Sequence, residues 1–146
     1  MNKLEELEDE CYTHHINLID ANIDDLTGAF INYKSTNIIA LNSNLDSNKK
    51  NCVLCEELGH FYKCATYNIN CEDESYIRKM EHKAKKYAIN RLVPLDRLKK
   101  LSINYNRYEI AQILDVTDEF LEMAVHYYRG ELWKGEKMVD MLPHLR

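Results

Sequence analysis

The feature that most constrains this fold is a carboxylate within the apolar face of a predicted helix. Over residues 75–92, Ile77, Ala84 and Ala88 recur at helical spacing, and Glu81 lies on the same face. Burying an unpaired carboxylate is costly, so Glu81 needs a partner from another part of the chain. The opposite face is basic and is expected to be solvated, with Arg78, Lys79, Lys83, Lys85 and Lys86.

A candidate partner lies on the preceding predicted helix, in the motif Glu56-Glu57-Leu58-Gly59-His60. Glu56 and His60 are four residues apart, so on a helix they project from one face. This is the spacing of the H-E-x-x-H zinc-peptidase helix, with a glutamate in place of the first histidine.

Together, Glu56, His60 and Glu81 would supply three metal ligands and leave a fourth position for water, which is the open arrangement of a catalytic metal site. Glu57, beside the metal, would be the general base that takes a proton from the bound water. Binding to the metal ion would also give the Glu81 carboxylate the cationic partner that it needs. The alternative from these residues alone is that Glu81 pairs with a nearby lysine or arginine, while Glu56 and Glu57 are surface charges.

Composition indicates an ordinary globular protein. A chain of 146 residues suits a single domain, and four glycines and two prolines favour helix over loop. The formal net charge of -5 argues against wrapping nucleic acid or an anionic membrane. The sequence has neither an apolar run long enough to span a bilayer nor the layout of a signal peptide at its N-terminus. We therefore expect a cytoplasmic protein.

The cysteines are odd in number, so a disulfide framework is not expected. They are Cys11, Cys52, Cys55, Cys64 and Cys71. The last four can be read as a four-cysteine zinc site. However, Cys52 and Cys55 lie in a helical apolar pattern rather than on a tight turn, which favours buried free thiols.

The patterns predict an α+β fold, in which a small three-stranded antiparallel sheet packs on a mainly helical domain. The expected elements are a helix over 3–15, a sheet over 16–41 with strands at 16–23, 29–33 and 37–41, a loop over 42–51, helices over 51–65 and 75–92, further helices over 95–130, and a tail over 131–146.

Residues 106–129 have the spacing of a helix-turn-helix, with Asp115 where the turn often has glycine. The would-be recognition helix begins Asp118-Glu119 and continues to Glu122. Acidic groups there would repel phosphates. We therefore interpret this pair as packing helices and expect no direct binding to nucleic acid.

Three separated stretches point to one family. They are residues 56–62, residues 80–88 with the following Leu92-Val93-Pro94, and residues 108–129. Together they resemble the ImmA/IrrE family of metallopeptidases of phages and mobile elements. The resemblance implies a zincin-like domain over residues 1–130, a metal held by Glu56, His60 and Glu81, and Glu57 as the base. It also implies a protein substrate, a helix-turn-helix repressor encoded nearby.

Glu56 departs from the more familiar first histidine of that family. One imidazole and two carboxylates make a harder, more anionic site, so zinc remains the first expectation but manganese or iron would also suit it. Weak or absent catalysis is the alternative. The protein would then be a peptidase-like module that binds a repressor without cutting it.

Overall fold

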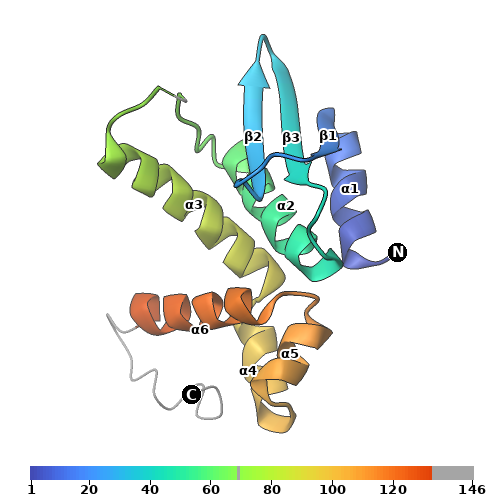
Figure 1. Ribbon diagram of the computed structural model, residues 1–146. Coiled ribbons are helices and arrows are strands. Elements are labelled where there is room, and N and C mark those ends of the chain that lie inside the picture. The colour runs from blue at the N-terminus through green and yellow to red at the C-terminus, as the bar shows by residue number, and fades with distance from the viewer. Residues whose placement is uncertain (69, 133–146) are drawn as a thin grey trace. The chain divides into compact units, whose positions relative to one another are not determined.

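The computed structural model describes residues 1–68 and 70–132 (Figure 1). In chain order the elements are α1 (Lys3–Thr13), β1 (Ile16–Ala21), β2 (Gly28–Tyr33), β3 (Thr36–Asn42), α2 (Ser47–Tyr62), α3 (Glu74–Leu92), α4 (Leu95–Asn104), α5 (Arg107–Ile113) and α6 (Asp118–Leu132). The chain divides into two compact units between Ala88 and Ile89. The predicted α+β class is confirmed, whereas the single domain over residues 1–130 stays a prediction.

The first unit contains a three-stranded sheet with the order β1-β3-β2. β2 and β3 form the predicted antiparallel hairpin, in which Tyr33 pairs with Thr36. Lys34 and Ser35 make its two-residue turn with positive φ angles of 49° and 63°. Two left-handed residues in succession are the geometry of a type I′ turn, whose twist matches that of the flanking strands.

The antiparallel prediction is wrong for β1, which runs parallel to β3, with Ile16 opposite Asn37. The segment after β1 does not make a hairpin. It carries the chain across to the far side of β3, where β2 forms the other edge of the sheet. Alternation of apolar and polar residues fixes which face of a strand is buried, but it does not fix which strand lies beside it.

The helices α1 and α2 pack on this sheet, as Figure 1 shows. Their core is apolar and fully enclosed, and it combines Leu7 and Cys11 of α1, Ile16, Ile39 and Leu41 of the sheet, and Val53, Leu54 and Leu58 of α2. Cys52 and Cys55 are also buried. The apolar side of α2 is therefore packed against α1 and the sheet.

The start of α2 differs from the prediction, because the helix begins at Ser47 rather than near residue 51. Asp46 is the N-cap, and its side chain accepts a hydrogen bond from the backbone N–H of Lys49 at 2.9 Å. A cap of this kind satisfies a backbone donor that the helix itself cannot pair. The cap stabilises a first turn made of polar residues. The polar composition of residues 42–51 had instead predicted a loop there.

The second unit contains α4, α5 and α6. Asn106 and Glu109 form a capping box at the start of α5, and Asp115 adopts a positive φ of 56° in the turn before α6. The predicted helical pair is therefore present. The predicted tail over residues 131–146 lies outside the described residues, apart from the backbone at the end of α6. Across the described part of the chain, no helix combines the length and apolar character needed to cross a bilayer.

Candidate active site

The helices that carry the predicted site residues approach closely at Gly59 of α2 and Ala84 of α3. A β-carbon on Gly59 would lie 2.7 Å from the carbonyl oxygen of Ala84 and 3.0 Å from its Cα. Only glycine leaves room for this approach. Gly59 directly precedes His60, and Ala84 is one helical turn after Glu81, so the close approach brings these two side chains together.

His60 is buried, with 7% of its surface exposed. Its Nδ1 is hydrogen-bonded to the carbonyl oxygen of Ala65, and its own carbonyl accepts a hydrogen bond from the N–H of Ala65 at 3.0 Å. Because a carbonyl oxygen can only accept, Nδ1 carries a proton. The second ring nitrogen, Nε2, then faces Glu81, and its distance to Oε1 of that carboxylate is 3.5 Å.

Besides its contact with His60, Glu81 also contacts the loop between α2 and α3. The hydroxyl of Tyr67 donates a hydrogen bond to Oε1 of Glu81 at 2.6 Å. The hydrogen bonds from His60 and Tyr67 lower the pKa of Glu81, against the effect of partial burial. Burial lowers the pKa of His60, but the contacts with Glu81 and Ala65 outweigh it and the pKa is raised. Without a metal ion, this contact therefore favours the charged pair of a Glu81 carboxylate and a His60 imidazolium.

Glu57 points into the first unit and is 9% exposed. Burial raises the pKa of Glu57 to about 7, although His60 and a hydrogen bond from the backbone of Phe30 in β2 act in the opposite direction. Nearby Glu56 and Glu81 add to the increase. A carboxyl group with this pKa can take up and release a proton near neutral pH.

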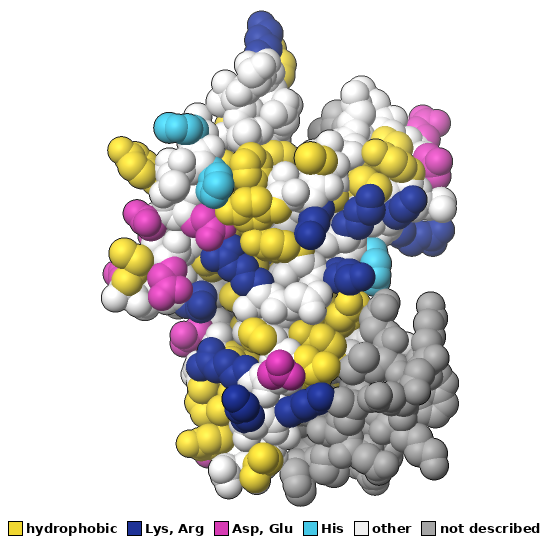
Figure 2. All heavy atoms as spheres, turned by 180° about the vertical axis from the view of Figure 1, so that it is seen from behind, with side chains coloured by type: hydrophobic (Ala, Val, Ile, Leu, Met, Phe, Trp, Pro, Cys, Tyr) yellow, Lys and Arg dark blue, Asp and Glu magenta, His cyan; other side chains and the backbone are white. Residues whose placement is uncertain are grey.

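Glu56 lies one turn before His60 on α2 and is partly buried. Burial raises the pKa of Glu56, Lys85 lowers it, and the charge of Glu81 raises it again. The five basic residues that were predicted to form the solvated face of α3 are exposed, and Figure 2 shows dark-blue spheres along this helix.

The pair formed by His60 and Glu81 fits a divalent ion. Ligand atoms at bond lengths of about 2.1 Å in a tetrahedral site lie roughly 3.4 Å apart. The observed separation of Nε2 and Oε1 is 3.5 Å. Hydrogen bonding of Nδ1 to a carbonyl also selects the tautomer in which Nε2 is available to a metal. Among residues 1–68 and 70–132, however, no three His, Cys, Asp or Glu side chains are placed together as a complete ligand set.

Residues 11–126 match the family described as Peptidase_M78, the IrrE N-terminal-like domain. The match covers well over half of the chain.

The chain belongs to this family.

The predicted ImmA/IrrE relationship is thereby confirmed. Comparison with curated proteins and with solved structures finds no match. Membership of a metallopeptidase family implies a divalent metal and a protein substrate.

Two contributors to this site were missed by reasoning from sequence, namely Ala65 and Tyr67. Both lie in the irregular segment between α2 and α3, where no periodic pattern assigns a direction to a side chain. Ala65 acts through its backbone, which carries no signal in residue type. Tyr67 is one of ten tyrosines in the chain, and nothing in its sequence context distinguishes it from the others.

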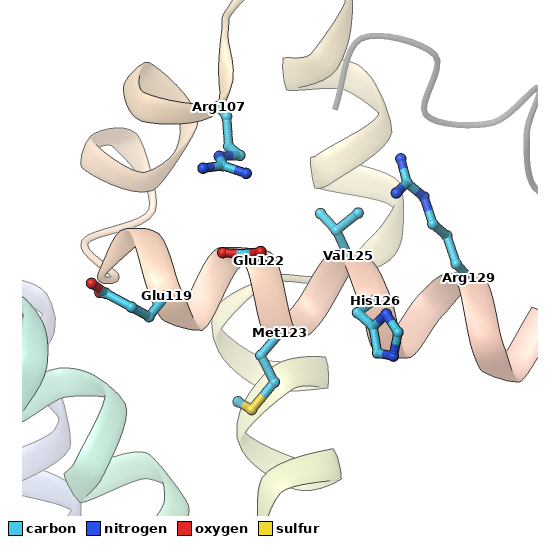
Figure 3. Close-up of a pocket in the computed structure, with 7 residues that line it drawn as sticks. All are labelled: Arg107, Glu119, Glu122, Met123, Val125, His126 and Arg129. Carbon is cyan, nitrogen blue, oxygen red and sulfur yellow. The ribbon is translucent and has the colours of Figure 1, made fainter. Parts of the chain in front are cut away.

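A separate cavity of about 420 Å³ lies in the second unit and contains none of the predicted site residues (Figure 3). It is lined by Arg107, Glu119, Glu122, Met123, Val125, His126 and Arg129. Figure 3 shows Arg107 and Glu122 pointing toward one another, whereas Met123 points to the other side of α6. The carboxylates lie on the helix that would meet DNA in a helix-turn-helix. This arrangement agrees with interpreting α5 and α6 as packing helices.

Proposed function

We propose that this protein is a metal-dependent endopeptidase in which Glu56, His60 and Glu81 hold a divalent ion and Glu57 is the general base. The observation that carries the proposal is the 3.5 Å separation between His60 Nε2 and Glu81 Oε1, which come from two different helices. Family membership supports the same reaction class. The buried position of Glu57 supports its role as the base.

The chain's own residues divide the chemistry between them. A bound divalent ion supplies a water of lowered pKa and polarises the peptide carbonyl. His60, whose ring is hydrogen-bonded to Ala65, would offer Nε2 to the ion, and Glu81 would offer its carboxylate. As a carboxylate, Glu57 takes a proton from the attacking water, and as a carboxylic acid it returns that proton to the departing amine. A pKa of about 7 suits both steps.

The donor set also bears on the metal. We propose zinc as the first candidate, as in other sites of the H-E-x-x-H type. One imidazole and two carboxylates supply more oxygen ligands than a site with two imidazoles does, so manganese and iron are the alternatives. The substrate we propose is a helix-turn-helix repressor encoded beside this protein in a phage or mobile element. That assignment comes from the family resemblance alone.

A second candidate function is a module that binds the repressor without cutting it. The partial burial of Glu56 is the observation that favours this function. Burial is the largest influence on Glu56 and raises its pKa, so a charged carboxylate is less favourable at this position than in water. If Glu56 does not join the site, the metal would be held by two side chains and catalysis would be weak.

Co-expression with the neighbouring repressor separates the two functions. In the endopeptidase, Glu57→Gln abolishes cleavage while the fold and the bound metal are retained. Cleavage that persists in Glu57→Gln rules out Glu57 as the base. In the binding module, the repressor is never cut, and its capture survives both Glu57→Gln and treatment with a chelator.

A further inference from the structure

Three consecutive residues after α2 are each tied to the candidate site or to α3. Ala65 is hydrogen-bonded to His60 through both its N–H and its carbonyl group. The carbonyl of Thr66 accepts a hydrogen bond from the hydroxyl of Tyr76 at 3.2 Å. Tyr67 donates to Glu81 at 2.6 Å. This segment, residues 65–67, therefore contacts two of the three proposed metal ligands, His60 and Glu81.

The hydroxyl of Tyr67 and Nε2 of His60 converge on the same atom, Oε1 of Glu81. The side chain of Glu81 is 35% exposed and has three rotatable bonds, so packing alone does not hold it in one orientation. A short hydrogen bond to one oxygen selects the rotamer in which that oxygen faces the imidazole. The ring of Tyr67 also lies edge-on to that of His60, with the centroids 6.5 Å apart.

We propose that Tyr67 is a positioning residue, whose hydroxyl orients Glu81 so that its carboxylate and His60 Nε2 are arranged for one divalent ion. This inference rests on the proposed metal site and adds to it a residue from the loop between α2 and α3. Partners of metal ligands fix ligand orientation in this manner, and their loss weakens metal binding roughly 10–100-fold.

The test is the metal affinity of Tyr67→Phe, with Tyr76→Phe as the matched control. Both substitutions delete one hydroxyl from an exposed tyrosine that anchors the same segment, but only Tyr67 contacts Glu81. Zinc and manganese are each titrated against a chromophoric chelator, without substrate. We expect Tyr67→Phe to weaken binding at least about 10-fold. Tyr76→Phe should bind as the wild type does.

Each other outcome overturns the proposal. Equal weakening in both variants means that Tyr67 only orders the loop. Unchanged affinity in Tyr67→Phe, with a wild type that binds metal, removes the positioning role but leaves the proposed function intact. A wild type that binds neither metal overturns the proposed function as well.

A second measurement uses cleavage of the co-purified repressor. A positioning role predicts that saturating metal restores kcat in Tyr67→Phe. A kcat that stays low at saturating metal would place the hydroxyl on the reacting atoms and would contradict the positioning role.

Discussion

Gly59 and Ala84 lie in backbone contact, because a β-carbon on Gly59 would come within 2.7 Å of the carbonyl oxygen of Ala84. This contact sets the distance between α2 and α3 at the level of the candidate site. His60 follows Gly59 in sequence, and Glu81 lies one turn before Ala84. The glycine of the Glu56–His60 motif is thus a structural requirement for pairing His60 with Glu81.

Replacing Gly59 with alanine should separate the two helices at this point. The neighbouring atoms belong to backbone, which cannot move aside as a flexible side chain would. We expect a loss of about 1–3 kcal/mol in the free energy of unfolding. We also expect weaker zinc binding, measured by competition with a chelator.

Gly130→Ala is the matched control, because nothing lies within 4 Å of a β-carbon at that position in α6. It should leave metal affinity unchanged and should not destabilise the protein, since alanine favours helix over glycine. A Gly59→Ala protein with wild-type stability and metal affinity would show that the helices are not held by this contact.

Replacing His60 with alanine should abolish stoichiometric metal binding, because it removes the one imidazole of the proposed ligand set. Metal content after purification, measured by mass spectrometry, tests this directly. His82→Ala is the control, since His82 is exposed on α3. Metal retained at wild-type content in His60→Ala would exclude His60 as a ligand.

The need of Glu81 for a partner was predictable from sequence because it rests on local spacing. Glu81 lies within an apolar helical face, and burial of a carboxylate without compensation is unfavourable whatever the tertiary fold. The direction of the His60 side chain relative to Glu56 was predictable as well, because residues four apart on a helix lie on the same face. The H-E-x-x-H-like spacing offered His60 as that partner but left a lysine or arginine as the alternative, and the family resemblance favoured the metal site with His60.

The parts that could not be predicted depend on long-range packing or on irregular backbone. β1 has the alternation of a strand, but its parallel pairing with β3 depends on the path of the connection between β1 and β2. Tyr67 reaches Glu81 only because the backbone at Ala65 folds back on His60. The roles of Glu56, Glu57, His60 and Glu81 in binding and catalysis stay predictions.

The second unit offers a test of stability that is independent of the site. The hydroxyl of Tyr128 donates a hydrogen bond to the carbonyl of Val93 at 2.6 Å, and both residues are buried. Tyr128→Phe leaves that carbonyl without this donor, so we expect a loss of about 1–2 kcal/mol in urea unfolding. Tyr108→Phe, at a position that is 62% exposed, should change stability little. Equal stability of the two variants would contradict this assignment.

The pKa of Glu57 predicts how stability depends on pH when a chelator removes metal. Burial raises the pKa of Glu57 from 4.5 to about 7 in the folded protein. A raised pKa means that the folded state binds the proton more tightly than the unfolded state. The stabilising contribution is therefore complete below pH 4.5 and is lost as pH rises through about 7. We expect the loss to be on the order of 2 kcal/mol.

Urea unfolding in EDTA between pH 5 and pH 8 measures this slope. Glu57→Gln cannot ionise and should flatten it, leaving the part due to His60, whose raised pKa acts in the same direction. Glu109→Gln, which changes an exposed carboxylate in the second unit, should retain the full slope. If Glu57→Gln and the wild type lose stability equally over this range, then Glu57 ionises at its ordinary pKa. It would then be too weak a base at neutral pH for the role proposed for it.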